Sequence, residues 1–303
     1  MRRLSELAVT SIAILLAPAI SAETTAFVNV NVVPMSIETV IEQQTVVVTD
    51  GVIAALGSVD EIPIPRGAKV IDGTDRFLMP GLAEMHAHVP GASSNNLDRY
   101  FSLYVANGVT TIRGMLGQPS HLELRDDLEN GSVFGPRLVT SGPSMNGRSV
   151  AGVSQARQLV RDQQRSGYDF IKIHPGLTAD EFEAIAATAN ELGIPFAGHV
   201  PVATGVARAL ELGIATIDHL DGYFAALLPA DSGGSGGYGG FFDVMLAAEV
   251  DVDRISEIAR ATAKAGTWNV PTETLIEVRI DATPVAELRN QPGTQFMLSL
   301  IHI

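Results

Sequence analysis

Residues 170–200, FIKIHPGLTADEFEAIAATANELGIPFAGHV, carry the clearest pattern of secondary structure in the chain. This stretch begins with an apolar run of strand length, continues with a helical repeat over residues 179–192, and ends in a second apolar run after Gly193. Thr178 and Glu181 have the spacing of a capping box, and Gly193 suits the end of the helix. The stretch therefore predicts a strand–helix–strand unit, which is typical of parallel α/β sheets.

The same alternation extends in both directions from this unit. Further helices are expected near residues 153–166, 203–212 and 252–265. The candidate strands lie at residues 82–89, 109–114, 137–142, 170–174, 195–200, 215–220 and 268–272. A closed barrel of this type has eight strands. The sequence therefore predicts an α/β protein, a (β/α)8 TIM-type barrel that is truncated after about its seventh strand.

The chain divides into four segments. Residues 1–22 combine a basic start, a short apolar core and small residues at Ile20-Ser21-Ala22, so we expect a signal peptide. Residues 23–78 show short β-type runs with a hairpin signal at Asp50-Gly51, which predicts the N-terminal part of a small β-domain, a partial β-sandwich. Residues 79–297 form the incomplete barrel. The tail at 298–303, LSLIHI, departs from the preceding pattern, and we expect it to be non-native, the end of a truncated reading frame.

Composition limits the function classes. The signal peptide predicts Sec-type export to the periplasm or the medium, with no membrane attachment after cleavage. The net charge of -14 argues against a nucleic-acid partner. The absence of cysteine excludes a thiol nucleophile, a disulfide framework and a cysteine-based metal site. The sequence leaves open whether the protein forms a homo-oligomer.

Histidines mark the predicted strand ends. His86 and His88 are two residues apart in an expected strand, so both side chains leave the same face and can bind one ion. The alternative is a pair of hydrogen-bonded histidines without a metal. His174, His199 and His219 each fall at the carboxyl end of a separate expected strand, where barrel active sites are built. Together they predict a metal site.

Lys172 lies between apolar neighbours on the same strand face as His174, so we expect it to point into the barrel. A buried ammonium is costly, and desolvation lowers the pKa of the amine. A neutral amine can add carbon dioxide and become a carbamate that bridges two cations. The alternative is a structural lysine that is ion-paired or extends its amine to solvent.

Four other residues are weaker candidates. Tyr223 follows the sixth expected strand and is a weak candidate for contact with substrate. His121 lies in the polar stretch HLELRDDLEN, and we expect it to be exposed. Arg113 and Arg137 flank strand ends, where we expect them to form ion pairs within the barrel rather than to bind a substrate carboxylate.

The motifs FLMPGLAEMHAHV (77–89), YDFIKIHPG (168–176) and IDHLDGY (217–223) resemble the amidohydrolase superfamily of metal-dependent hydrolases, in its prolidase-like and imidazolonepropionase-like branch. The resemblance implies two divalent metal ions, Zn²⁺ above all, and carbon dioxide for carbamylation of a lysine. It places His86 and His88 on one metal, His199 and His219 on the other, and carbamylated Lys172 as the bridge.

The implied activity is hydrolysis of a C–N amide-type bond in a dipeptide or a cyclic amide. The implied nucleophile is a metal-bridging hydroxide, and His174 is a candidate contact for the substrate.

The sequence departs from the family at one point. The superfamily's eighth strand ends in an aspartate that acts as acid and base, and nothing after residues 268–272 supplies it, since Asp281 follows too closely. One alternative function is therefore an exported, non-catalytic or inactive protein with the amidohydrolase fold. Another is a mononuclear enzyme in which Lys172 remains an amine.

Overall fold

The structure is a computed structural model that describes residues 23–229, 240–274, 277 and 283–290. The chain divides into two compact units, one ending at Pro80 and one beginning at Gly81. The expected signal peptide (1–22), most of the glycine-rich stretch (232–240), Asp281 and the expected non-native tail (298–303) lie outside the described residues. None of the described helices is long and apolar enough to cross a bilayer.

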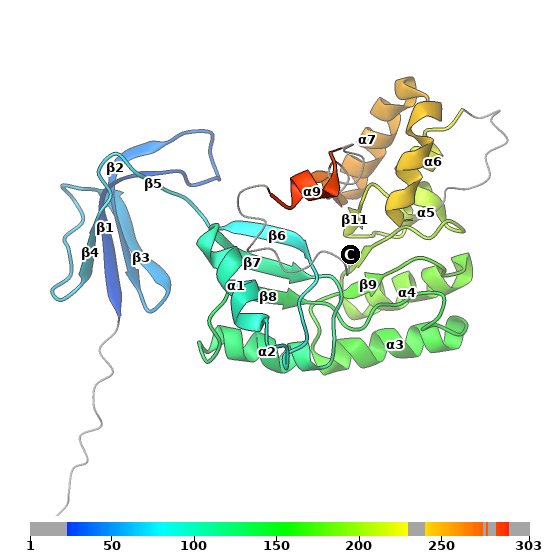
Figure 1. Cartoon of the computed structure of the whole chain (residues 1–303), viewed down its shortest axis with the longest axis horizontal. Helices are drawn as coiled ribbons and strands as arrows, with labels where there is room; N and C mark the ends of the chain where they lie inside the picture. The colour runs from blue at the N-terminus through cyan, green and yellow to red at the C-terminus, as the bar shows by residue number, and fades with distance from the viewer. Residues whose placement is uncertain (1–22, 230–239, 275–276, 278–282, 291–303) are drawn as a thin grey trace, which may run out of the picture. The chain divides into compact units, whose positions relative to one another are not determined.

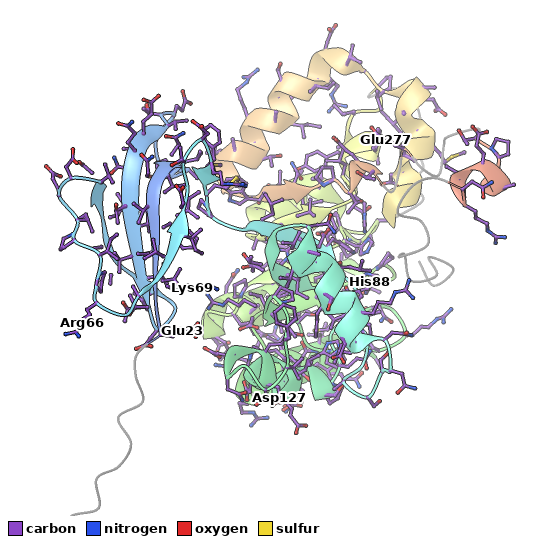
Figure 2. The ribbon with its side chains drawn as sticks, turned by 60° about the vertical axis from the view of Figure 1, so that its left-hand side comes forward. Glu23, Arg66, Lys69, His88, Asp127 and Glu277 are labelled. Carbon is purple, nitrogen blue, oxygen red and sulfur yellow. The ribbon has the colours of Figure 1, made fainter. Side chains whose placement is uncertain are left out.

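The first unit is a β-sheet. Its strands are β1 (Thr24–Val32), β2 (Ile41–Thr49), β3 (Val52–Ser58), β4 (Lys69–Asp72) and β5 (Phe77–Leu78). They are ordered β3-β2-β1-β4, and β5 also pairs with β1. The hairpin expected at Asp50-Gly51 joins β2 to β3, and both residues have the positive φ that such a tight turn needs. Because β1 and β4 are parallel, Glu23 and Lys69 lie at the same end of the sheet (Figure 2).

The second unit contains parallel strands. Those described are β6 (Leu82–Ala87), β7 (Val109–Gly114), β8 (Arg137–Thr140), β9 (Ile171–Ile173), β10 (Phe196–Gly198), β11 (Thr216–Asp218) and β12 (Trp268–Val270). They form one sheet in the order β6-β7-β8 and another from β9 to β12, and a parallel bridge between Ser141 and Phe170 links the two. Each predicted strand is present, and the parallel α/β architecture is confirmed. Among the described residues no ladder joins β12 to β6, so the pairing does not close a barrel.

Helices connect these strands. They are α1 (Leu97–Ala106), α2 (Ser120–Glu129), α3 (Val153–Ser166), α4 (Ala179–Leu192), α5 (Gly205–Glu211), α6 (Tyr223–Ala226), η1 (Gly240–Glu249), η2 (Val252–Arg254), α7 (Ile255–Ala265) and α9 (Val285–Leu288). The predicted capping box is present, since Thr178 Oγ1 accepts from Glu181 N and the Glu181 carboxylate accepts from Thr178 N. α3 and α4 lie side by side (Figure 1), and the main core joins them to β9 and β10.

The expectation that His121 is exposed is wrong. Its side chain is fully buried in the first turn of α2, and its Nε2 lies 3.1 Å from the carbonyl oxygen of Pro90. Residues three apart share a helix face, so His121 and the buried Leu124 both point inward while Glu123 between them is exposed. The polar composition of the helix concealed this narrow buried face.

Candidate metal centre

Five histidines meet at the carboxyl ends of the parallel strands. His88, His174, His199 and His219 directly follow β6, β9, β10 and β11, and His86 lies within β6. The ring centroids of His86 and His219 are 4.6 Å apart, those of His199 and His219 are 5.0 Å apart, and those of His174 and His199 are 4.8 Å apart. The structure thus brings together all the histidines that the sequence predicted for the site.

His86 and His88 have the spacing of two ligands of one ion. Their Nε2 atoms are 3.2 Å apart. Two nitrogens at zinc–nitrogen bonding distance in a tetrahedral site are separated by about 3.3–3.4 Å. The two side chains leave the strand on the same face, as their spacing in the sequence predicted.

Asp218 is the central residue that sequence reasoning missed. Its side chain is fully buried, and its Oδ2 lies 2.6 Å from Lys172 Nζ and 3.3 Å from His86 Nδ1. Ligand atoms of His86, Asp218 and His219 all lie within 4.8 Å of one another, close enough to hold a metal ion. One signal was available: a buried lysine needs an anionic partner, and Asp218 is an acidic residue within the expected strand at residues 215–220.

Burial keeps four of the histidine rings neutral, those of His88, His174, His199 and His219. Desolvation, followed by the positive charges of neighbouring residues, lowers the pKa of His88 to about 4. The same causes lower the pKa of His174, His199 and His219 to about 3. Neutral imidazole is the form that binds a metal ion. At pH 7 these rings therefore need to lose no proton before they ligate.

Lys172 and Asp218 form a buried ion pair. Burial lowers the pKa of Lys172, and the Asp218 carboxylate opposes that shift. Burial alone would raise the pKa of Asp218, but Lys172 and His86 hold it below its usual range. Lys172 is completely buried, as the sequence predicted.

Two further groups orient the histidine rings. Asp221 Oδ2 lies 2.6 Å from His199 Nδ1, and Thr272 Oγ1 lies 2.7 Å from His219 Nδ1. In both rings Nδ1 is engaged, so Nε2 is the nitrogen that would face a metal. Burial and the nearby carboxylates of Asp243 and Asp218 raise the pKa of Asp221 to about 8. Sequence reasoning missed both groups, because their partners are identified only by the fold.

The remaining candidates differ in position. His174 is half-buried and stacks on His199 with an interplanar angle of 24°. The hydroxyl of Tyr223 is 2.9 Å from Thr262 Oγ1, which commits it to α7. Arg113 forms the expected internal ion pair, with its Nη2 3.5 Å from Asp218 Oδ1. Arg137 is exposed at the start of β8 and makes none of the ion pairs found among the described residues.

Gly198 makes room for Lys172. Its φ is +127°, and a Cβ atom placed there would lie 2.4 Å from the carbonyl oxygen of Ile173 and 3.0 Å from Lys172 Nζ. Gly213 also has a positive φ, +82°, but a Cβ there would meet nothing within 4 Å.

We therefore expect Gly198→Ala to lower the free energy of unfolding by clearly more than the roughly 1–2 kcal/mol of backbone strain expected for Gly213→Ala. Urea unfolding of the metal-free protein measures both values. Equal losses for the two variants would show that the space at Gly198 is not needed.

The residues of the centre lie in the part of the chain that matches a known family. The model of the amidohydrolase family matches residues 77–302. The chain belongs to the amidohydrolase family. A search of curated proteins gives no match.

Solved structures agree with this assignment. Bottromycin amidohydrolase is 26% identical to this chain, with a TM-score of 0.56. The match covers 68% of this chain and 46% of bottromycin amidohydrolase, so this chain spans about half the length of that protein. A Xaa-Pro dipeptidase with bound methionine is 19% identical, with a TM-score of 0.61 over 86% and 70%. Ochratoxinase of A. niger is 19% identical, with a TM-score of 0.62 over 85% and 66%. The two likenesses at 19% identity show the shared fold.

Proposed function

We propose that this amidohydrolase is a metal-dependent enzyme that cleaves the C–N bond of a small peptide or a cyclic amide. The observation that carries the proposal is the convergence of five histidine rings, Lys172 and Asp218 at the carboxyl ends of parallel strands. The similar solved structures include a Xaa-Pro dipeptidase and bottromycin amidohydrolase, whose names support this bond class. A dipeptidase-like enzyme and a cyclic-amide hydrolase both fit.

The residues present fit a metal. Besides the neutral rings, His86 Nδ1 and Asp218 Oδ1 are buried and make no hydrogen bond among the described residues, only the ion-pair contacts of 3.3 Å with Asp218 Oδ2 and 3.5 Å with Arg113 Nη2. Buried polar atoms in this state are uncommon and point to a missing ligand. In the proposed centre His86 and His88 hold one ion, His199 and His219 hold a second, and Lys172 lies between them. When bound, two divalent cations such as Zn²⁺ would activate water and polarise the scissile carbonyl.

Charge supports a carbamate on Lys172. Arg113 and Lys172 are cations of the buried site, and Asp218 is the anion that faces both. Two divalent ions would add four positive charges beside neutral imidazoles, which is strongly unfavourable in a buried site. The ammonium of Lys172 first loses one proton; the neutral amine then attacks carbon dioxide, forms an N–C bond and releases a second proton, so the side chain changes from a cation to an anion. His174, stacked on His199, is the proposed contact for the substrate.

One observation favours a second candidate. The 2.6 Å contact between Lys172 and Asp218 is a satisfied ion pair, and His86, Asp218 and His219 form a cluster able to hold a single ion. This would be a mononuclear enzyme in which Lys172 remains an amine.

A protein with this fold but no turnover is a third candidate, because among the described residues none after β12 supplies a further aspartate. Export by a Sec-type signal peptide remains a proposal.

The test combines metal analysis with a substrate screen. The full chain is loaded with Zn²⁺ in the presence and absence of bicarbonate, its bound metal is counted, and a dipeptide library is assayed beside cyclic amides. Two ions per chain with amide hydrolysis support the proposal. Bound metal without turnover on either class supports the non-catalytic alternative, and a chain that binds no metal overturns the proposal.

A further inference from the structure

Arg113 links strands that are distant in the sheet. It lies on β7 and is 8% exposed. Its Nε donates to the carbonyl oxygen of Met85 on β6 at 2.9 Å, and its Nη2 donates to Thr216 Oγ1 on β11 at 3.0 Å. The guanidinium carbon lies 5.5 Å from the ring centroid of Phe170, just before β9. Arg113 and Thr216 are 103 residues apart. One side chain therefore contacts both groups of strands.

Both hydrogen-bond partners of Arg113 lie close in sequence to residues of the proposed metal centre. Met85 immediately precedes His86, and Thr216 lies two residues before Asp218 and three before His219. The two oxygens of the Asp218 carboxylate face different residues, because Oδ1 faces Arg113 at 3.5 Å while Oδ2 faces Lys172 and His86. Arg113 thus favours the orientation in which a single oxygen of Asp218 faces the histidines.

The contacts argue against a direct role in binding substrate. The Nε and Nη2 donors of Arg113 are already used by the protein, and the side chain is almost fully buried. The same contacts argue against a role for Arg113 in packing alone, because an apolar side chain of similar volume stabilises a core at least as well as a buried charge does. The planar guanidinium has a fixed spacing between its donors, which suits it to holding two strands at a set separation.

We propose that Arg113 is a positioning residue of the metal centre, which cross-links β6 to β11 and so fixes His86 relative to Asp218 and His219. This inference rests on the proposed function, since it assumes that these residues bind metal. Arg113 acts through main-chain and side-chain contacts and touches neither metal nor substrate.

The test compares three variants in metal binding. Arg113→Lys keeps the positive charge but cannot reach the two hydrogen-bond partners in the same geometry. Arg113→Met removes the charge and both hydrogen bonds. Arg125→Met is the matched control, because Arg125 also donates to a main-chain carbonyl, that of Gly167, and pairs with an aspartate, Asp169. The affinity of each full-length variant for Zn²⁺ is measured by competition with a chelator, and the visible spectrum of the Co²⁺-loaded protein reports the ligand geometry.

We expect Zn²⁺ affinity to fall about ten- to a hundredfold in Arg113→Met and by less in Arg113→Lys, which is the range for groups that orient metal ligands. The Co²⁺ spectrum should change in both, while Arg125→Met keeps the wild-type affinity and spectrum. Wild-type affinity and spectrum in Arg113→Lys would overturn the inference, even if Arg113→Met failed to fold. A wild-type chain that binds no metal would instead overturn the proposed function, and this role with it.

Discussion

Replacing Asp218 with asparagine is expected to lower the free energy of unfolding of the metal-free protein by about 3–5 kcal/mol, the range for removing one partner of a buried ion pair. The carboxylate is fully buried and lies 2.6 Å from Lys172 Nζ. In Asp218→Asn the ammonium keeps its burial but loses its counter-ion. Urea unfolding in the presence of a chelator measures the loss.

A double variant separates this cause from a general packing defect. Lys172→Met/Asp218→Asn removes the stranded charge together with its partner, so we expect it to be more stable than Asp218→Asn alone. If the double variant loses as much free energy of unfolding as Lys172→Met and Asp218→Asn lose separately, added together, the ion pair is not the reason for the effect.

The pH dependence of Asp218→Asn gives a second check. Burial already lowers the pKa of Lys172, and loss of Asp218 removes the main interaction that opposes the shift. The folded variant then binds fewer protons than the unfolded chain below the ordinary lysine pKa, so its stability rises with pH. We expect its deficit relative to the wild type to shrink between pH 7 and pH 9.

Local sequence patterns were sufficient to predict most of the second unit. The helix over residues 179–192 was predicted to the residue and the one near residues 153–166 was located correctly, because glycine or a capping box marks their ends. The strands were found because each is a short apolar run after a turn signal. His121 was misjudged because the stretch around it is polar overall, whereas its burial depends on how α2 packs.

The histidines of the candidate site could be placed from the sequence where a single strand carries the information. His199 and His219 could be placed because each follows a recognisable strand, and parallel strands bring their carboxyl ends together. Asp218 and Arg113 were harder, since the partner of Asp218 is 46 residues away and that of Arg113 is 103 residues away. A charge in an apolar run indicates that a partner exists, but the fold alone decides which residue it is.

Loss of the Lys172 amine is expected to have the largest effect on the metal centre. If Lys172 carries the bridging carbamate, Lys172→Ala removes the anion that holds two cations together. We expect the zinc content to fall from two ions to at most one per chain, and any amide hydrolysis to fall by at least about 10²–10³-fold. Lys264→Ala is the matched control, because Lys264 is exposed on α7 and should leave both values unchanged.

Chemical rescue identifies the bridge itself. Lys172→Ala leaves a space where the side chain was fully buried, and a short carboxylic acid such as propionate can place a carboxylate there. Propionate should then restore part of the second zinc equivalent in Lys172→Ala and change nothing in the wild type, whose own zinc content should rise with bicarbonate. If the wild type binds one ion regardless of bicarbonate and propionate has no effect on Lys172→Ala, the bridge does not exist. The ion pair between Lys172 and Asp218 would then belong to the working, mononuclear centre.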